Sequence, residues 1–392
     1  MNFIPYGRQH IDRNDIDAVV GVLNTEYLTT GPMVTAFEEA IEAYCGARYV
    51  VAVSSGTAAL HLASLALLKS GDKVLTTPNS FLATANAIVY AGATPVFVDI
   101  ASDGNIDLDL CEQYLQEYDD IKAIYGVHFS GNPLHQAKLQ SLRERYDIVI
   151  LEDCAHSIGA SNGGITAGSC TNSECSVFSF HPVKHLTTGE GGAVTTNSEE
   201  LYQKLLLLRN HGIQRDGALW VNRTMAYDRK GNSNPWYYEM QELGFNYRIT
   251  DIQCALGVTQ LQKLPLFLKK RRHIAQVYDT AFKETPLIVP LYDFCEDSAY
   301  HLYVVTIAFS KLRITKAELF LKMREKNIGL QLHYIPINKQ PYYTQRGYGN
   351  EDTPVMDAYY ATALSLPIYY DLSHHEQSYV IETLLAIVNE NS

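Results

Sequence analysis

Short, uninterrupted apolar runs alternate with longer helical patterns between residues 49 and 196. A strand that is covered by helices on both faces is apolar throughout, instead of apolar at every second position. Seven strands are expected, at Tyr49–Val53, Lys73–Thr76, Pro95–Asp99, Ile121–Val127, Ile148–Asp153, Ser176–Phe180 and Ala193–Thr196. The alternation of strand and helix patterns predicts a doubly wound α/β domain.

Helical patterns lie on both sides of this region. They predict helices at Arg13–Leu23, Met33–Cys45, Ser198–Arg209 and Lys269–Phe282, with an extended arm before the first of them. Two strand patterns, Tyr303–Phe309 and Gly329–Tyr334, follow the last helix, whereas the stretch from Gln214 to Asn234 is too polar for a core. Because 392 residues are too many for one simple core, we expect two domains. Residues 1–262 should form the arm and a large α/β domain, and residues 263–392 a smaller α+β domain.

The composition of the chain limits the classes of binding partner and indicates the cellular compartment. The chain is 46% hydrophobic and 19% charged, has no apolar run that could span a membrane, and starts without the apolar segment of a signal peptide. Its net charge of −12, without a basic block, argues against nucleic acid as a partner. Seven cysteines at irregular spacing are typical of reduced thiols in a cytoplasmic protein. Cys170 and Cys175 lack a second Cys/His pair, so we expect no metal site.

Lys184 lies in a short connection between two predicted strands, before a loop that contains three glycines. Rigid backbone on both sides would hold its side chain in place. Desolvation lowers the pKa of a lysine and frees its amine as a nucleophile toward aldehydes. A solvated surface lysine before a glycine-rich turn is the alternative, and other features of the chain decide between the two.

Two further stretches carry groups that suit a phosphorylated, cationic ligand. Val53-Ser-Ser-Gly-Thr-Ala-Ala-Leu60 reads as a strand that turns at Gly56 into a helix, and the free N–H groups of a helix start bind phosphate. Asp153 ends an apolar strand, at the sheet edge where open α/β folds bind ligands. A buried carboxylate requires a cationic partner or hydrogen-bond donors. The alternative for Asp153 is a helix N-cap.

The motif around the lysine, Ser179-Phe-His-Pro-Val-Lys184-His-Leu-Thr-Thr-Gly-Glu-Gly-Gly192, resembles that of sugar aminotransferases that use pyridoxal phosphate. Gly244-Phe-Asn-Tyr-Arg-Ile-Thr-Asp251 is a second strong mark of this group, the DegT/DnrJ/EryC1/StrS family, and the resemblance covers almost the whole chain. It implies the aspartate-aminotransferase-like fold, PLP fold type I, with a mostly parallel seven-stranded sheet in the large domain. It also implies a homodimer with shared active sites.

The resemblance assigns roles residue by residue. Lys184 would be the catalytic residue and hold pyridoxal 5'-phosphate as a covalent imine. Asp153 would pair with the protonated pyridine nitrogen, with the aromatic side chain of Phe81 and His156 beside the ring. The phosphate contacts would come from Thr57, Ala58, Ser179 and, across a dimer, Asn246 of a neighbouring subunit.

Other marks, among them Tyr6-Gly-Arg and His301-Leu-Tyr, resemble the branch of the family that works in pseudaminic acid biosynthesis. That branch transfers an amino group from L-glutamate to C4 of UDP-2-acetamido-2,6-dideoxy-β-L-arabino-hexos-4-ulose. The product is UDP-4-amino-4,6-dideoxy-N-acetyl-β-L-altrosamine. The UDP-sugar would contact Tyr6, Glu26, Tyr27, Leu28, Thr29, Ser55, Gln331, Leu332, His333 and Tyr334.

Two alternative functions remain open from the sequence. One is a C4 aminotransferase for another UDP- or dTDP-4-keto-6-deoxy sugar, which would use the same chemistry on a different acceptor. The other is a non-catalytic regulatory protein that binds pyridoxal phosphate; such proteins normally carry a fused DNA-binding region. A sugar dehydratase of the same group has histidine in place of the lysine, so Lys184 argues against dehydration.

Overall fold

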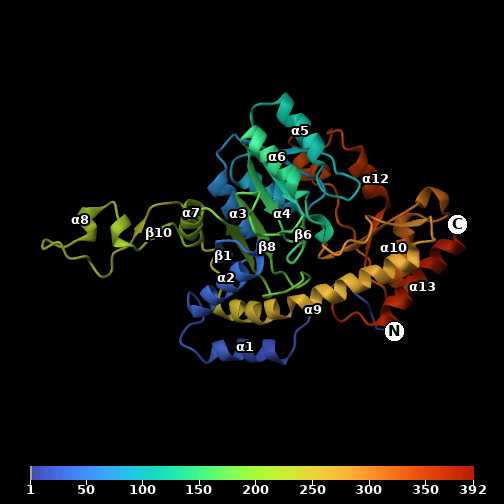
Figure 1. Ribbon diagram of the computed structural model, residues 1–392, viewed down its shortest axis with the longest axis horizontal. Helices are drawn as coiled ribbons and strands as arrows, with labels where there is room; N and C mark the ends of the chain where they lie inside the picture. The colour runs from blue at the N-terminus through green and yellow to red at the C-terminus, as the bar shows by residue number, and fades with distance from the viewer. Residues whose placement is uncertain (1) are drawn as a thin grey trace.

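A seven-stranded sheet forms the centre of the large domain in the computed structural model, which describes residues 2–392 (Figure 1). Its strands are β1 (Tyr49–Val53), β2 (Lys73–Thr76), β3 (Thr94–Phe97), β4 (Ile121–Val127), β5 (Val149–Asp153), β8 (Cys175–Ser179) and β9 (Gly192–Thr196). Their order is β1-β9-β8-β5-β4-β2-β3, and only β9 runs antiparallel to its neighbours. The predicted fold class and all seven predicted strands are confirmed, with bounds that differ by one or two residues.

Helices cover both faces of this sheet. The helices of the large domain are α2 (Pro32–Cys45), α3 (Gly56–Leu67), α4 (Leu82–Tyr90), α5 (Leu108–Glu117), α6 (Gln136–Tyr146) and α7 (Glu199–Arg209). One apolar cluster joins α3, α4 and α7 to side chains such as Leu151, and another joins α5 and α6 to side chains such as Ile150. Because side chains alternate along a strand, Asp153 lies on the α3 and α4 side, as does Ser179 on β8.

A single long helix, α9 (Asp251–Phe282), connects the large domain to the C-terminal part of the chain, as the yellow to orange helix of Figure 1 shows. Its first half packs under the sheet through Leu261 and Leu264, and its second half enters a different core through Tyr278 and Phe282. The sequence prediction, which began this helix at Lys269, was therefore too short. A capping box at Thr250 and Gln253 starts the helix, and Pro265 lies within it.

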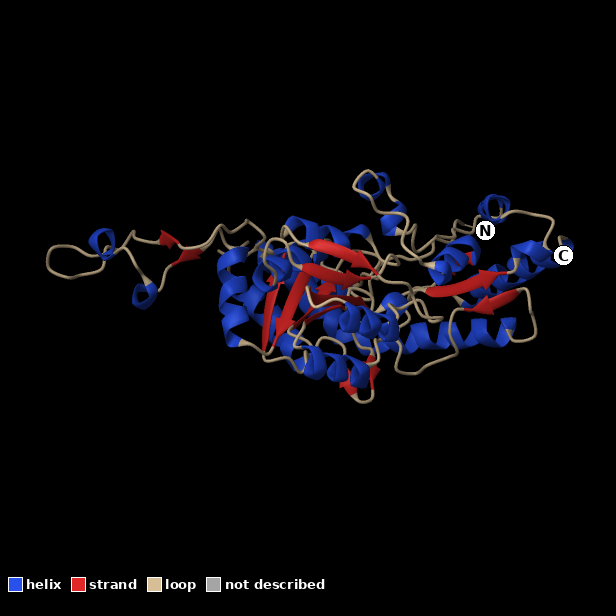
Figure 2. Ribbon diagram, turned by 90° about the horizontal axis from the view of Figure 1, so that it is seen from above, coloured by secondary structure: helices blue, strands red, loops and turns tan. Residues whose placement is uncertain are grey.

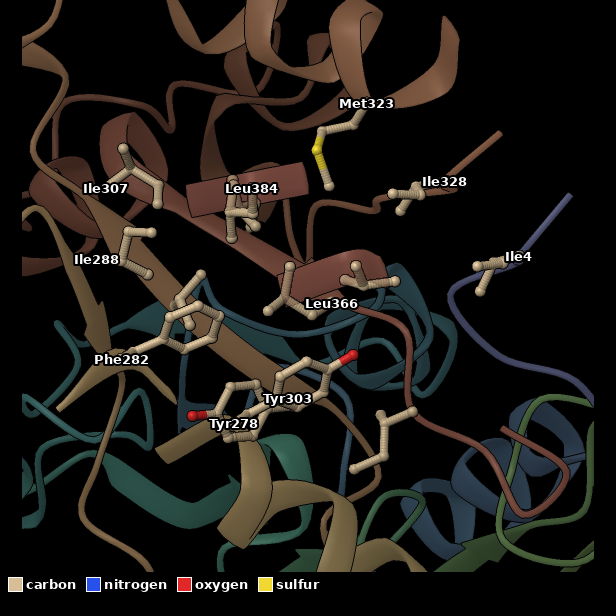
Figure 3. Packing of buried hydrophobic residues seen from close by; sticks show 14 of the residues in the cluster. Ile4, Tyr278, Phe282, Ile288, Tyr303, Ile307, Met323, Ile328, Leu366 and Leu384 are labelled. Atoms are coloured by element: carbon tan, nitrogen blue, oxygen red, sulfur yellow. The ribbon is translucent and has the colours of Figure 1, made fainter. Parts of the chain in front are cut away.

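The C-terminal core surrounds a three-stranded antiparallel sheet (Figure 3). Its elements are β12 (Ile288–Pro290), β13 (Tyr303–Ile307), β14 (Ala363–Leu366), α10 (Lys316–Glu325) and α13 (His374–Glu390). The helices α11 (Pro341–Thr344) and α12 (Pro354–Thr362) pack in two smaller clusters, with Phe97 and Phe129 respectively. The predicted strand Gly329–Tyr334 is wrong: this segment makes one isolated bridge, from Gln331 to Ser365 on the outer edge of β14, and no continuous ladder. The predicted domain boundary at residue 262 stays a prediction.

The N-terminal arm joins the same C-terminal core. Ile4 is buried there, its N–H donates to the carbonyl of Asn327 (2.8 Å), and its carbonyl accepts from the N–H of Gly329 (2.8 Å). Helix α1 (Arg13–Leu23) then packs against α9. Small hairpin strands β6 (Ser161–Asn162) and β7 (Ile165–Thr166) complete the large domain. No helix within residues 2–392 has both the length and the apolarity needed to cross a membrane.

Residues 213–243, which we call the finger, project away from the large domain (Figures 1 and 2). The finger begins and ends with the two-stranded ladder β10 (Ile213–Gln214) and β11 (Glu239–Met240), and it contains the short helix α8 (Arg223–Ala226). Buried Trp220 and Ala226 give the finger a small core of its own, although the sequence is poor in apolar residues there. Other apolar side chains of the finger face solvent, above all Val221, Trp236 and Leu243, which are 76–78% exposed.

Asp251, the first residue of α9, connects this helix to the start of α2 through hydrogen bonds. Its two carboxylate oxygens accept hydrogen bonds from the N–H groups of Gly31 (2.8 Å) and Met33 (2.9 Å). We expect Asp251→Ala to lower the free energy of unfolding by about 1–3 kcal/mol, because both amides lose their acceptor. Urea unfolding of the variant checks this. Asp17→Ala, which removes only an exposed ion pair with Arg13, should cost at most about 0.5 kcal/mol, and equal losses would contradict the role of Asp251.

Candidate active site

A pocket of about 590 Å³ opens at the carboxyl ends of β4, β5 and β8. The starts of α3 and α4 form one side of it, the loop after β8 forms the floor, and a loop of the C-terminal part closes the other side. Twelve predicted site residues line this pocket: Tyr6, Ser55, Thr57, Phe81, Asp153, His156, Ser179, Lys184, Gln331, Leu332, His333 and Tyr334. The chain thus brings together residues that lie more than 300 positions apart in sequence.

Lys184 projects into the pocket from a tightly bonded loop. Its own N–H donates to the carbonyl of His181 (2.9 Å), and the hydroxyl of Thr187 donates to the carbonyl of Phe180 (3.0 Å). Enclosure by protein lowers the pKa of the Lys184 amine from 10.5 to about 8, although the carboxylate of Asp153 acts in the opposite direction. A substantial fraction of this amine is therefore neutral, and nucleophilic, near neutral pH.

Asp153 ends β5 and is almost completely buried. Its Oδ2 accepts a hydrogen bond from the hydroxyl of Thr84 (2.7 Å), and its Oδ1 accepts one from the N–H of Ala155 (3.1 Å). Both donors fit an ionised carboxylate, which can accept further hydrogen bonds through its remaining lone pairs. The side chain can therefore bind a cationic N–H group from the pocket.

The first turn of α3 forms an anion-binding cradle. The hydroxyl of Ser55 caps the helix by accepting from the N–H of Ala58 (3.0 Å), and Thr57 and Ser179 add hydroxyl groups beside it. Gly56 makes this close approach possible, because a Cβ at that position would lie 2.8 Å from the Cβ of Ser179. Free N–H groups and hydroxyls at a helix start are a common phosphate site.

Neutral histidines and a tyrosine form the remaining wall. Nε2 of His156 lies 3.1 Å from the hydroxyl of Tyr334, and the ring of His301 packs on His156 with centroids 4.3 Å apart. Burial holds the pKa values of His156 and His301 well below the ordinary range, and it lowers the pKa of His333 to about 3. These rings therefore act as uncharged packing and hydrogen-bonding groups. Phe81, 58% exposed, presents its ring to the open pocket.

Six predicted site residues lie outside this pocket. Ala58 is buried one residue further along α3, where only its N–H is near the cradle. Glu26 and Tyr27 line a separate depression between α1, α2 and α9, and Leu28 and Thr29 follow them along the chain. Asn246 pairs with Asn210 at the base of the finger. The roles predicted for these residues stay predictions.

Several lining residues were not anticipated from the sequence. Ser80 lies in the loop before α4, Thr84 lies in the first turn of that helix, and Glu190 lies in the glycine-rich loop. His301 also lines the pocket, whereas the His301-Leu-Tyr motif by itself indicated no role for it at the site. The position of Thr84, three residues after the aromatic Phe81, is a weak signal, since helical residues at that spacing share a face.

Comparison with known proteins agrees with this geometry. Residues 9–385 match the DegT/DnrJ/EryC1/StrS aminotransferase family. The chain belongs to this family. A Campylobacter jejuni relative, UDP-4-amino-4,6-dideoxy-N-acetyl-beta-L-altrosamine transaminase, is 38% identical over 99% of this chain and 98% of its own length.

Solved structures of the family superimpose closely. Helicobacter pylori PseC, an aminotransferase involved in the biosynthesis of pseudoaminic acid, has a TM-score of 0.90 at 30% identity, with 99% of this chain and 100% of that chain covered. The PLP-form of the sugar aminotransferase Spr1654 from Streptococcus pneumoniae has a TM-score of 0.87 at 28% identity, with 99% of each chain covered.

The pocket of this aminotransferase fits pyridoxal phosphate, the cofactor of the family. A neutral amine at Lys184, a carboxylate at Asp153 and a helix start with free donors are the three groups that the aldehyde, the ring nitrogen and the phosphate require. The Nδ1 of His156, which is buried and has no hydrogen-bond partner within residues 2–392, lies in the same wall. All three main contacts come from one face of the sheet.

The lowered pKa of Lys184 predicts how the rate of cofactor capture depends on pH. The rate at which the cofactor-free protein captures pyridoxal phosphate should rise as the amine loses its proton and level off above pH 8 or so. An N-acetyl-lysine amide measured in parallel corrects for the titration of the aldehyde itself. Lys184→Ala should abolish the fast phase, and a rate that keeps rising toward pH 10.5, the ordinary pKa of lysine, would contradict the effect of burial.

Proposed function

We propose that this aminotransferase moves an amino group from L-glutamate to C4 of UDP-2-acetamido-2,6-dideoxy-β-L-arabino-hexos-4-ulose, in pseudaminic acid biosynthesis. The observation that carries the proposal is the convergence of Lys184, Asp153 and the α3 cradle in one open pocket, in a chain 38% identical to the Campylobacter jejuni transaminase. The product would be UDP-4-amino-4,6-dideoxy-N-acetyl-β-L-altrosamine.

The chemistry divides between the cofactor and the chain. Pyridoxal phosphate, when bound, supplies an electron sink for the charge that develops when a proton leaves the substrate carbon. Asp153, whose carboxylate is held by Thr84 and Ala155, would pair with the protonated ring nitrogen, and the α3 cradle would hold the phosphate. Once its amine is released, Lys184 would act as the general base: Nζ would take the proton from the donor carbon and deliver it to C4′, the carbon on the other side of the transferred nitrogen. A pKa of about 8 suits both directions of this transfer.

The wall opposite the cofactor cradle is suited to a nucleotide sugar. Tyr6, Gln331 and the backbone around Leu332 line it, and they present aromatic and amide groups to the pocket. Such groups stack on a base and bond sugar hydroxyls and amides. The Phe81 side remains open enough for glutamate and the sugar to enter in turn.

We also propose that the working unit is a homodimer in the cytoplasm, with two shared active sites. Within residues 2–392, Lys184 is the only lysine or arginine that lines the pocket, whereas the cofactor, glutamate and a UDP-sugar all carry negative charge. A second copy would add the amide of Asn246 as a hydrogen-bond donor to the phosphate and would bring the Glu26–Thr29 stretch to the nucleotide-sugar site. The exposed apolar side chains of the finger, among them Trp236, favour such a contact. Seven free cysteines favour the cytoplasm.

The acceptor is tested by half-reactions. The protein is loaded with amino groups from glutamate, freed of glutamate, and mixed with single UDP- and dTDP-4-keto-6-deoxy sugars. Return of the absorbance of the lysine-bound cofactor should occur with the L-arabino UDP-ketosugar and not with D-configured or dTDP sugars. A response confined to another sugar would replace the proposed acceptor, and failure of glutamate to load the protein would remove the proposed donor.

Shared sites are tested by mixing two inactive variants. Lys184→Ala and Asn246→Ala chains should each be inactive alone, because each lacks one contact of every site. After co-refolding in equal amounts they should recover about a quarter of the wild-type activity, since half of the dimers are mixed and each mixed dimer has one intact site. Recovery that stays absent, while mixed dimers are isolated through two different tags, would place Asn246 in the site of its own chain, and an active Asn246→Ala chain would place it outside the site.

A further inference from the structure

A buried chain of three side chains links the start of α4 to the carboxylate of Asp153. The hydroxyls of Ser80 and Thr84 are 2.8 Å apart, and the hydroxyl of Thr84 is 2.7 Å from Oδ2 of Asp153. Their exposed fractions are 3%, 1% and 4%, so water competes little for these bonds. The three residues come from α4, from the loop before it and from β5, and all of them line the pocket.

The acceptor at the end of the chain sets the direction of both hydrogen bonds. An ionised carboxylate only accepts, so the single hydroxyl hydrogen of Thr84 points to Asp153. The oxygen of Thr84 is then an acceptor, and the hydroxyl of Ser80 donates to it. Each donation strengthens the next, since aligned hydrogen bonds polarise one another.

The location of these two hydrogen bonds matters as much as their direction. Ser80 and Thr84 bracket Phe81, whose ring faces the pocket, and the preceding carbonyl of Pro78 accepts from the N–H of Ile337 in the C-terminal part. The hydrogen bonds therefore join the segment that carries the aromatic ring to the strand that carries the carboxylate. The N–H of Ala155 occupies the other oxygen of Asp153, which leaves the remaining lone pairs directed to the pocket.

We propose that Thr84, oriented by Ser80, is a positioning residue that keeps the carboxylate of Asp153 aimed at the ring nitrogen of the cofactor. Without the hydroxyl of Thr84, Oδ2 of this buried carboxylate would lose the side-chain donor that fixes its orientation, and the carboxylate would hold the ring N–H⁺ less well. The inference rests on the proposed function, because it requires pyridoxal phosphate chemistry at this site.

The test measures ligand affinity of the cofactor-free protein, apart from turnover. Pyridoxamine 5'-phosphate is the probe, since it has no aldehyde to react with Lys184, and the second probe is its analogue with C–H in place of the ring nitrogen. Thr84→Val keeps the shape and removes the hydroxyl; it should weaken pyridoxamine phosphate binding by about tenfold or more and leave the binding of the analogue unchanged. Thr84→Ser should restore wild-type affinity, and Ser80→Ala should weaken it by a smaller factor.

Matched controls separate positioning from stability. Thr76→Val removes another fully buried hydroxyl, which donates to the carbonyl of Tyr125 (3.1 Å) and does not line the pocket; it should leave both affinities unchanged. Nitrogen-15 spectra of labelled cofactor should show loss of the ring N–H⁺ signal in Thr84→Val alone. Equal weakening of both probes, or none, would overturn the role of Thr84. Failure of the wild-type protein to bind pyridoxamine phosphate would overturn the proposed cofactor chemistry itself.

Discussion

The carboxylate of Asp153 is enclosed by protein on every side but one, and a buried charge of this kind requires donors and an opposite charge. Two donors come from the protein, from Thr84 and the backbone of Ala155, and the open side faces the pocket that contains Lys184. The lysine itself loses affinity for its proton in the same enclosure. The site therefore contains a fixed anion and an amine that gives up its proton far more readily than an ordinary lysine, a combination suited to a cationic heterocycle with an aldehyde.

This arrangement depends on the order of the strands. Parallel strands β4, β5 and β8 end at the same edge, and the loop after β8 returns through the antiparallel strand β9. Lys184 is thereby held between two strands of the sheet centre, where few backbone motions can move it. The helix start of α3 meets β8 at Gly56, which completes the phosphate cradle on the same edge.

The C-terminal part closes the pocket through α9 and the N-terminal arm. Arg271, buried in α9, donates to the carbonyls of Tyr300, His301 and Ile368. A buried guanidinium bonded to three carbonyls connects the helix to the segments that support the His156 wall. Burial without a carboxylate partner lowers the pKa of Arg271 to about 10, which leaves it charged at neutral pH. The wall of the pocket thus depends on contacts between cores that are distant in sequence.

Local sequence determined the seven strands of the large domain and the turn at Gly56, and it placed Lys184 and Asp153 at strand ends, because each of these features follows from a short apolar run and the residues at its end. Tertiary structure decided the rest. The Gly329–Tyr334 segment has a strand pattern, but it meets the outer edge of β14 only at the bridge between Gln331 and Ser365, while β14, about 30 residues later, supplies the third strand of the sheet. The sequence pattern did not predict the full length of α9, because the two halves of the helix pack into different cores. Likewise, nothing in the sequence around Thr84 indicates a carboxylate partner 69 positions away, because a single hydroxyl has no pattern and only folding brings the two side chains to 2.7 Å.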